Sequence, residues 1–483
     1  MRRELLIDAV PGEVRAALVE DGEVAEVHID RDGHRSPVGN IYLGRVEAVE
    51  PSLQAAFVAL PGGGQPGFLA AKHLGALAAG QPGPRRVERL LHQGQLVLVE
   101  VTRDPLGDKG PGLTTLVTLP GRLLVYHPFR DGNVLSGAIR DEAERDRLEA
   151  IAARAAGAVG DGGFIVRTAA QKEDETALLD EARALHGSWL DLRDRAARAR
   201  EPVCLKQDLP PLQRTLRDLA RPQLARIAVE GYALHAEARG YLARHMPELL
   251  PLLEVHDDAA PLFEAAGVEA AIDAALETRL DMAGGGWITI EPVEALTAVD
   301  VNSGDGTAES GREQTGFTTN LRAAALIARQ LRLRDLGGMV LVDFIHMESP
   351  KHRDRVLDAL REALAGDRSP CAVLGWSRMG LCELTRRRGR ATLPDLLAGG
   401  HAGPAGRRAR SVETAGYDAL RRLRAEAAAR PGATLSVTAH PDVIEWLGAG
   451  GRPEAMAALA GKPPRLTADA GLSVEATVIQ ADR

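Results

Sequence analysis

Apolar and polar residues alternate over residues 1–35, where "ELLIDAV" and "VRAALVEDGEVAEVHID" favour strands joined by a turn at "EDGE". This alternation predicts a hairpin or a meander. Residues 36–124 continue with short apolar stretches separated by Gly-rich turns such as "PGGGQPG". Short strands with Gly-rich turns are typical of a small β-barrel. The beginning of the chain is therefore predicted to be rich in strands.

Helical patterns begin in the next part of the chain. Within residues 125–208, "RDEAERDRLEAIAARAA" and "KEDETALLDEARALHGSWLDLRDRAARAR" predict two charged helices, and "GGFIVRTAA" between them predicts a buried strand that ends at Arg167 and Thr168. Residues 209–276 are predicted to be mixed, with "LARIAVEG" as a strand. The many charges of the long helix are more typical of a solvated face than of a binding surface.

Two apolar runs within residues 277–395 each lead directly into an aspartate. They are "ALTAVDVNSGDG" and "GGMVLVDFIHM", and the strong helical pattern "TTNLRAAALIARQLRLRDLGG" separates them. Thr318 or Thr319 is predicted to cap that helix, and Gly337 to end it. A strand–helix–strand order of this kind favours an α/β layer.

The aspartates of these two runs are Asp300 and Asp343. Chemistry in α/β proteins concentrates beyond the carboxyl ends of strands, so the two side chains are candidates for one site. Two carboxylates that converge repel each other unless a cation lies between them, and Mg²⁺ accepts one or two carboxylates together with waters and a phosphate oxygen. Asn302 faces the same side of an extended strand as Asp300. The spacing alone leaves open that these are ordinary acidic residues after two strands.

Composition and charge describe an ordinary globular chain. It has 483 residues, which corresponds to roughly three domains, and a net charge of -8. An acidic total argues against a protein covered in basic charge, but it does not exclude a local basic channel for nucleic acid. Residues 396–411 read as a linker, and residues 412–483 as a small α+β domain.

Cysteine usage and apolar runs bear on the compartment. Cys204, Cys371 and Cys382 form neither a disulfide framework nor a CxxC metal pair, which fits a reducing compartment. The start of the chain lacks the apolar segment of a signal peptide, and no apolar run approaches the roughly 20 residues of a membrane span. We therefore expect a cytoplasmic protein without a membrane partner.

Several longer motifs together resemble the ribonuclease E/G family. They are "GNIYLGRVEAVEPSLQAAFV", "GDKGPGLTT", "GGFIVRTA", "EALTAVDVNSG", "TNLRAAALIARQLRLRDLGGMVLVDFIHM" and "SRMGLCELTRRR". Their order and spacing are collinear with the catalytic half of that family over nearly the whole chain. The chain stops after the small domain, so it is more similar to the short, ribonuclease G-like members.

The resemblance implies an α+β multidomain fold. It implies an RNase H-like domain made of residues 1–35 and 209–276, split by an OB-fold of the S-one RNA-binding type (36–124) and a 5′-sensor (125–208), followed by a DNase I-like α/β catalytic domain (277–395), a degenerate zinc link (396–411) and a small α+β domain (412–483). The split of the RNase H-like domain rests on the resemblance alone.

The resemblance also implies roles for single residues. It implies a metal site at Asp300 and Asp343 supported by Asn302, RNA contacts at Phe57, Phe68, Arg103 and Lys109, and a 5′-monophosphate sensor made by Gly121, Val125, Arg167 and Thr168. Without it, barrel core is the favoured interpretation of the two phenylalanines, and a surface pair is the favoured interpretation of Arg167 and Thr168. The arginines of "TRRRGR" and Arg378 either line the RNA path or belong to a solvated helix end; those of the motif are Arg386, Arg387, Arg388 and Arg390.

The chain departs from the family pattern at several positions. The Cys-Pro-x-Cys zinc link is missing, and His401 alone cannot build a tetrahedral site, so no zinc is expected. His346 replaces an acidic residue of the family's "DFIDM". Paired sensor arginines read Gly137 and Ala138, and a further sensor-side arginine reads Pro370. A weaker preference for 5′-monophosphate ends is the hypothesis that follows.

The expected function is a Mg²⁺-dependent, single-strand-specific endoribonuclease that leaves 5′-phosphate ends in RNA processing and turnover, such as rRNA maturation and mRNA decay. The sequence leaves open whether Mn²⁺ can replace Mg²⁺. Single-stranded RNA is the expected partner, and the resemblance allows a homodimer through the small domain without a zinc bridge. The alternatives are an RNA-binding protein of the same fold with weak or lost cleavage and, from the barrel alone, a structural or ribosome-assembly role.

Overall fold

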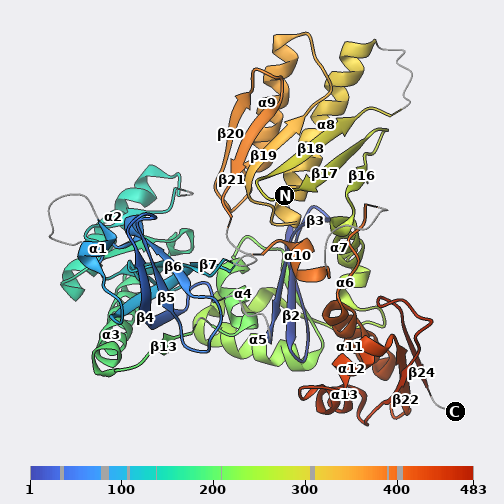
Figure 1. The fold of residues 1–483 in the computed structure, drawn as a ribbon, viewed down its shortest axis with the longest axis horizontal. Coiled ribbons are helices and arrows are strands. Elements are labelled where there is room, and N and C mark those ends of the chain that lie inside the picture. The colour runs from blue at the N-terminus through green and yellow to red at the C-terminus, as the bar shows by residue number, and fades with distance from the viewer. Residues whose placement is uncertain are drawn as a thin grey trace. The chain divides into compact units, whose positions relative to one another are not determined.

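The computed structural model describes residues 2–32, 37–77, 86–105, 109–137, 139–207, 209–304, 311–388, 391–399 and 406–481. The chain forms two compact units, and each is described by itself. The first unit combines Met1–Arg35 with Pro222–Arg483, and the second is Ser36–Arg221 (Figure 1).

The first unit begins with a sheet whose strands come from both sides of the second unit in the sequence. Its order is β15-β14-β1-β2-β3, made of β1 (Arg3–Val10), β2 (Glu13–Glu20), β3 (Glu23–Arg31), β14 (Arg226–Glu230) and β15 (Leu253–His256). Asp21 and Gly22, with φ of 50° and 85°, make the tight hairpin turn that "EDGE" predicted. β1 and β14 pair in parallel, so the second unit is inserted between strands of one sheet.

Helices complete this part of the first unit. They are α5 (Tyr232–His245), η4 (Pro247–Leu252), α6 (Leu262–Ala265), α7 (Val268–Leu276) and α10 (Leu393–Leu397). Leu6 and Ala17 of the sheet bury their side chains with Phe263 and Ile272 of the helices α6 and α7. The core therefore lies between the sheet and helices that follow it much later in the sequence.

A second sheet of the first unit contains both aspartate-bearing runs. Its order is β16-β17-β18-β19-β21-β20, made of β16 (Arg279–Asp281), β17 (Trp287–Pro292), β18 (Leu296–Asn302), β19 (Gly338–Asp343), β20 (Cys371–Trp376) and β21 (Cys382–Arg386). β18 and β19 pair in parallel, as a strand–helix–strand unit requires. The crossover is α8 (Arg312–Leu333), and α9 (Pro350–Leu364) follows β19.

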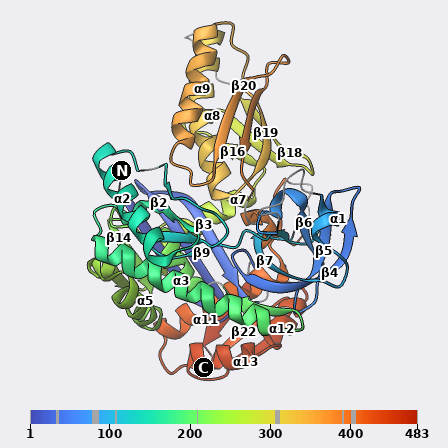
Figure 2. The same cartoon turned by 90° about the vertical axis from the view of Figure 1, so that its left-hand side faces the viewer.

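Both helices cover the same face of this sheet (Figure 2). Val299 and Val301 of β18 and Val340 and Val342 of β19 point into the core that the helices form with the sheet. The alternate residues of β18 and β19 lie outside that core and face the other way. The sheet therefore has a helix-covered face and an opposite face, which we call the open face.

The helix α8 differs from its prediction at both ends. It begins at Arg312 after Gly311, so Thr318 and Thr319 lie inside it, and it ends at Leu333 before Gly337. The prediction failed because the first turns are polar, and a search for an apolar stripe starts too late. Glu and Gln are nevertheless good helix formers, so a polar turn extends the helix.

The second unit contains the predicted small barrel. Its sheet has the order β13-β4-β5-β6-β8-β7, made of β4 (Ile41–Glu50), β5 (Ala55–Ala59), β6 (Gly67–Ala70), β7 (Leu96–Arg103), β8 (Gly112–Thr114) and β13 (Val203–Lys206). A further pairing of β4 with β7 closes five of these strands into a barrel, which fits an OB-like domain. Two short helices accompany it, η2 (Ala71–His73) and α1 (Val87–Leu90).

The rest of the second unit packs helices on a small sheet. The sheet has the order β11-β12-β10-β9, made of β9 (Leu119–Pro120), β10 (Leu124–His127), β11 (Val134–Leu135) and β12 (Gly163–Val166). Its helices are α2 (Glu142–Val159), η3 (Thr168–Ala170), α3 (Glu175–Arg198) and α4 (Pro211–Leu219). Tyr126, Phe164 and Trp189 are the large side chains of the shared core.

The chain ends in a small α+β domain. It contains α11 (Val412–Ala429), β22 (Leu435–Ala439), α12 (Pro441–Leu447), α13 (Arg452–Ala460), β23 (Arg465–Ala468) and β24 (Thr477–Ala481), with the strand order β23-β22-β24. Ion pairs connect α11 to the first sheet, including that of Arg424 with the buried Asp8 at 2.8 Å. In the part of the chain that the structure describes, no helix is long and apolar enough to cross a membrane.

Candidate active site

The two aspartates are direct neighbours across parallel strands. Asp300 of β18 and Asp343 of β19 are Cα partners in the strand pairing, and both are exposed on the open face of the sheet. Asp343 is the last residue of its strand, whereas β18 continues two residues beyond Asp300. The expectation that both lie at strand ends therefore holds for Asp343 only, but the pairing brings the two carboxylates to one place.

Asn302 supports one of these carboxylates. Its Nδ2 donates a hydrogen bond of 2.7 Å to Oδ2 of Asp300, which requires both side chains to lie on the same face of the strand. An amide donor fixes one carboxylate oxygen and leaves the other free for a further partner. The arrangement holds Asp300 in one orientation on the open face.

The residues present fit a divalent cation. Among the described residues, no lysine, arginine or histidine forms an ion pair with Asp300 or Asp343, so the two adjacent negative charges lack a counter-charge from that part of the chain. Within the same described ranges, no group of three or more His, Cys, Asp or Glu residues could hold a metal by itself. Two carboxylates suit Mg²⁺ in particular, because this ion keeps several waters and binds phosphate oxygens.

A row of strand-paired residues crosses the outside of the barrel. Cα partners in successive strands are Phe57 with Phe68, Phe68 with Gly112, and Gly112 with Arg103. The two rings meet edge to face with centroids 5.9 Å apart. Arg103 is exposed at the end of the row, and Lys109 is exposed in the segment that precedes Gly112.

The phenylalanines do not belong to the barrel core. Their strand neighbours Ala56, Val58 and Leu69 are fully buried in that core, whereas both rings are half-buried on the other face. Simple core packing is therefore not the reason for aromatic residues at these positions. Aromatic rings beside exposed cations are the elements of a platform on which bases stack.

The predicted sensor residues lie close together, but the side chains of Arg167 and Thr168 already bind other groups of the protein. Arg167 donates through Nη1 to the carbonyl oxygen of Gly121 at 2.7 Å, and its Nη2 lies 3.5 Å from the Asp218 carboxylate. The hydroxyl of Thr168 lies within hydrogen-bond distance of the Ser136 hydroxyl, at 3.1 Å. A phosphate would have to compete with these contacts for the guanidinium and the hydroxyl.

The turn beside Arg167 is held by a carboxylate that the sequence did not point to. Glu181 of α3 accepts hydrogen bonds from the N–H groups of residues 122–124 at 2.7–2.8 Å, and burial raises its pKa above the usual range. Val125 follows in β10, half-buried between Pro120 and Ile165 of the neighbouring strands. The sequence could not indicate this role, because Glu181 is one of many charged residues on a long helix and its partners lie about sixty residues earlier in the chain.

Known proteins resemble this chain over most of its length. The sequence profile of the Ribonuclease E/G family matches residues 118–389. The chain is 37% identical over 455 residues to Ribonuclease G of Escherichia coli (strain K12), which covers 92% of each chain. The chain belongs to the ribonuclease E/G family.

Further relatives come from both branches named in the family. Ribonuclease G of Haemophilus influenzae is 37% identical over 430 residues, or 87% of each chain. Ribonuclease E of Nostoc sp. is 38% identical over 378 residues, which is 77% of this chain and 54% of that protein. The matches to ribonuclease G sequences over 87–92% of their length make this chain a ribonuclease G-like member of the family.

The arginines around the end of β21 differ in burial, and one of them cannot line an RNA path. Arg386 is buried and pairs with Asp335 at 2.6 Å and Asp367 at 2.7 Å, so it supports the fold and does not line a path for RNA. Arg387 and Arg388 are exposed, and so is Arg378 in the turn before β21. Arg390 lies outside the described residues.

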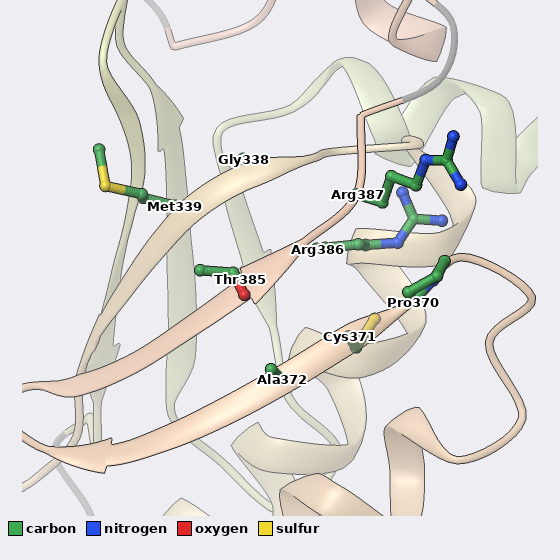
Figure 3. A pocket seen from close by; sticks show the side chains of 8 residues that line it. All are labelled: Gly338, Met339, Pro370, Cys371, Ala372, Thr385, Arg386 and Arg387. Carbon is green, nitrogen blue, oxygen red and sulfur yellow. The ribbon is translucent and has the colours of Figure 1, made fainter. Parts of the chain in front are cut away.

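A pocket of about 470 Å³ lies on the open face beside these arginines, and Figure 3 shows its lining. The residues that line it are Gly338, Met339, Pro370, Cys371, Ala372, Thr385, Arg386 and Arg387. The two arginines lie at the same end of the pocket, away from Met339 (Figure 3). Pro370 stands in this lining where the family resemblance expects an arginine.

The other positions at which the sequence departs from the family pattern are either exposed or outside the described residues. His346 is exposed in the loop that follows Asp343, and Gly137 is exposed before α2. Ala138 and His401 lie outside the described residues.

Burial raises the pKa of Cys204, and raises those of Cys371 and Cys382 to about 11 and about 12 respectively, so these thiols stay protonated at neutral pH.

Proposed function

We propose that this chain is a divalent-metal-dependent endoribonuclease, specific for single strands, that leaves 5′-phosphate and 3′-hydroxyl ends. The chain is an endoribonuclease that acts in RNA processing and turnover, as its family and its relatives named ribonuclease G and ribonuclease E indicate. The observation that carries the proposed mechanism is the direct pairing of Asp300 with Asp343 on an open sheet face. rRNA maturation and mRNA decay are the cellular processes we propose for it.

In this proposal, Asp300 and Asp343 hold Mg²⁺, and Mn²⁺ can replace it. When bound, the ion would supply Lewis acidity for the scissile phosphate and lower the pKa of a water. Asp300 and Asp343 position that charge beside the RNA backbone, and both are exposed, so the backbone can reach them. Asn302 keeps Asp300 in one orientation through its hydrogen bond.

The barrel would hold the single-stranded substrate. Bases stack on Phe57 and Phe68, while Arg103 and Lys109 contact phosphates. The half-buried rings on the outer face and the exposed cations beside them support this assignment. A double strand keeps its bases stacked on each other, which explains a preference for single strands.

Arg167 and Thr168, with the backbone of Gly121 and Val125, would form the pocket for a 5′-monophosphate. A guanidinium and a hydroxyl grip a terminal phosphate well. Their contacts with Gly121, Asp218 and Ser136 support a weak preference for that end, as does the absence of arginines at Gly137 and Pro370.

We further propose a homodimer formed through residues 412–483 without a zinc bridge, and a cytoplasmic location. The segment 396–411 contains no cysteine, so a zinc link of the family type has no ligands to use there. Light scattering of the purified chain measures the assembly directly.

The experiment on the proposed mechanism replaces each aspartate by the isosteric amide. Asp300→Asn and Asp343→Asn each remove one negative charge from the pair and should lower cleavage of a short AU-rich oligonucleotide at least about 100-fold, with RNA affinity close to that of the wild type. Asp258→Asn, at an exposed acid of the same unit, is the control. Cleavage at the wild-type rate by Asp343→Asn contradicts the mechanism.

The same assay decides between the enzyme and the alternative of an RNA-binding protein with weak or lost cleavage. The retained Asp–Asn–Asp arrangement favours the enzyme. If the wild-type chain binds the oligonucleotide but does not cut it with Mg²⁺ or Mn²⁺ present, the alternative holds.

A further inference from the structure

The loop that follows Asp343 has no regular secondary structure. Residues 344–349 connect β19 to α9, and Phe344 and Met347 bury their side chains in the core on either side of exposed His346. Buried backbone N–H and C=O groups outside helices and sheets need other partners. The partners of this loop come from one face of α8.

Asn320 satisfies both backbone groups of Ile345. Its Nδ2 donates to the Ile345 carbonyl oxygen at 2.8 Å, and its Oδ1 accepts from the Ile345 N–H at 3.0 Å. Asn320 has 0% of its surface exposed. Asparagine is a poor residue for a helix interior, so its value here lies in the contact with the loop.

Two other positions of α8 hold the same loop. Glu313 accepts hydrogen bonds from the N–H groups of Glu348 at 2.9 Å and Ser349 at 3.2 Å. Gly316 lets the loop approach closely, because a Cβ built there would lie 3.1 Å from Cγ2 of Ile345. Positions 313, 316 and 320 share one helix face, as the spacing of three and four residues requires.

The support matters because Asp343 has a strand partner on one side only. It pairs with Asp300 of β18, but the pairing of β19 with β21 ends one residue earlier, at Val342 and Cys382. Among the described residues, the first side chain that binds the backbone after Asp343 is Asn320, through its two hydrogen bonds with Ile345. Small errors in the placement of a metal ligand weaken a site strongly.

We propose that Asn320 is a positioning residue for Asp343: it fixes the backbone two residues beyond this carboxylate and thereby sets its place beside Asp300. The inference rests on the proposed function, because it assigns the purpose of the Asp pair to binding a divalent cation. Asn320 makes its hydrogen bonds to the backbone of Ile345, so it acts through the loop.

The test compares Asn320→Ala with Gln330→Ala. Gln330 is a matched control because it is 3% exposed, lies near the other end of α8, and accepts a hydrogen bond from Arg334 at 2.7 Å. Mn²⁺ affinity is measured by electron paramagnetic resonance without RNA, hydrogen exchange is followed in the peptide that contains the Ile345 amide, and the Mg²⁺ midpoint of cleavage is recorded.

Asn320→Ala should bind Mn²⁺ about tenfold more weakly, raise the Mg²⁺ midpoint of cleavage by a similar factor and speed exchange at Ile345. Gln330→Ala should keep the wild-type Mn²⁺ affinity even if it unfolds at lower urea concentration. Wild-type Mn²⁺ affinity in Asn320→Ala, or an equal loss in Gln330→Ala, overturns the proposal.

Gly316→Ala keeps the test decisive if Asn320→Ala does not fold. Alanine favours the helix by about 1 kcal/mol over glycine, but here its methyl group would crowd Ile345. We expect Mn²⁺ affinity to fall several-fold without loss of stability. Gly240→Ala in α5, where an added Cβ meets nothing within 4 Å, is its control and should leave Mn²⁺ affinity unchanged. Equal Mn²⁺ affinity in both glycine variants overturns the proposal.

Asp343→Asn, measured in parallel, separates the two levels of inference. If it cuts RNA as the wild type does, the proposed function itself fails. If it is inactive while Asn320→Ala binds Mn²⁺ normally, only the positioning role fails.

Discussion

At the scale of single residues, the sequence pointed to the chemistry but not to its geometry. Alternation along β18 predicts that Asp300 and Asn302 share a face, and the hydrogen bond between them confirms this. The register that pairs Asp300 with Asp343 joins strands separated by a long helix, so no local pattern could specify it. Asn320 was missed because a polar residue within a helical pattern gives no local indication of the group that it will contact.

The phenylalanines of the barrel give a prediction at this scale. Phe57→Ala and Phe68→Ala should each weaken binding of single-stranded RNA by about 1–3 kcal/mol, because each removes one stacking surface. Tyr232→Ala, at an aromatic residue with 65% exposure outside the barrel, is the control. Fluorescence anisotropy with a labelled oligonucleotide measures the loss, and unchanged affinity in both variants speaks against the barrel platform.

At the scale of elements, the sequence predicted which segments are helices and strands, but it did not predict where a helix begins or which of its residues are buried. The helix α8 and the strands beside it are where the periodicity placed them, but the helix starts at Arg312. Arg332 is buried and pairs with Glu20 and Glu26 at 2.9 and 3.0 Å, although charged residues of a helix ordinarily lie on its solvated face. A charged residue can lie on the buried face only when another element supplies an opposite charge. The sequence of α8 does not indicate that β2 and β3 supply such charges.

The sensor region gives the prediction at this scale. RNAs with 5′-monophosphate and 5′-triphosphate ends should be cut at nearly equal rates, because Arg167 and Thr168 are engaged by protein groups. Gly137→Arg should raise the monophosphate advantage, since a side chain there meets nothing within 4 Å. Gly157→Arg on α2, where space is equally open, is the control. A large monophosphate advantage in the wild type contradicts this account.

At the scale of the whole molecule, the sequence suggested domains but could not show how distant segments pair. The first sheet takes strands from residues 3–31 and 226–256, an association that the family resemblance implied but that no hydrophobic pattern along the chain indicates. Buried charges then tie the C-terminal domain to this sheet. Asp8 lies between Arg15 at 2.7 Å and Arg424 at 2.8 Å. Arg15 is the strand partner of Asp8 in the same hairpin, whereas nothing in the order of the chain matches Asp8 with Arg424 of α11.

The Asp8 cluster predicts how stability depends on pH. Burial raises the pKa of Asp8, but Arg15, Arg424 and Arg421 outweigh it and hold the pKa well below the usual range. A depressed pKa stabilises the fold fully above the unfolded value of about 3.9, and this contribution is lost as pH falls towards the folded value. Asp8→Asn should therefore unfold at lower urea concentration at pH 7, and the difference from wild type should shrink below pH 4.

The control for this prediction is Asp258→Asn, at a side chain that is 83% exposed. It should leave the urea midpoint close to that of the wild type at every pH. A difference between Asp8→Asn and wild type that stays constant from pH 7 to pH 3 would show that the carboxylate charge is not the cause.

The central claim is that Asp300 and Asp343 share one divalent cation. Anomalous diffraction from a crystal soaked in Mn²⁺ tests it most directly. We predict one anomalous peak on the open face of the sheet, in direct contact with oxygens of both carboxylates, that disappears in Asp343→Asn. A peak that contacts neither aspartate, or a site that survives the loss of Asp343, would contradict the account.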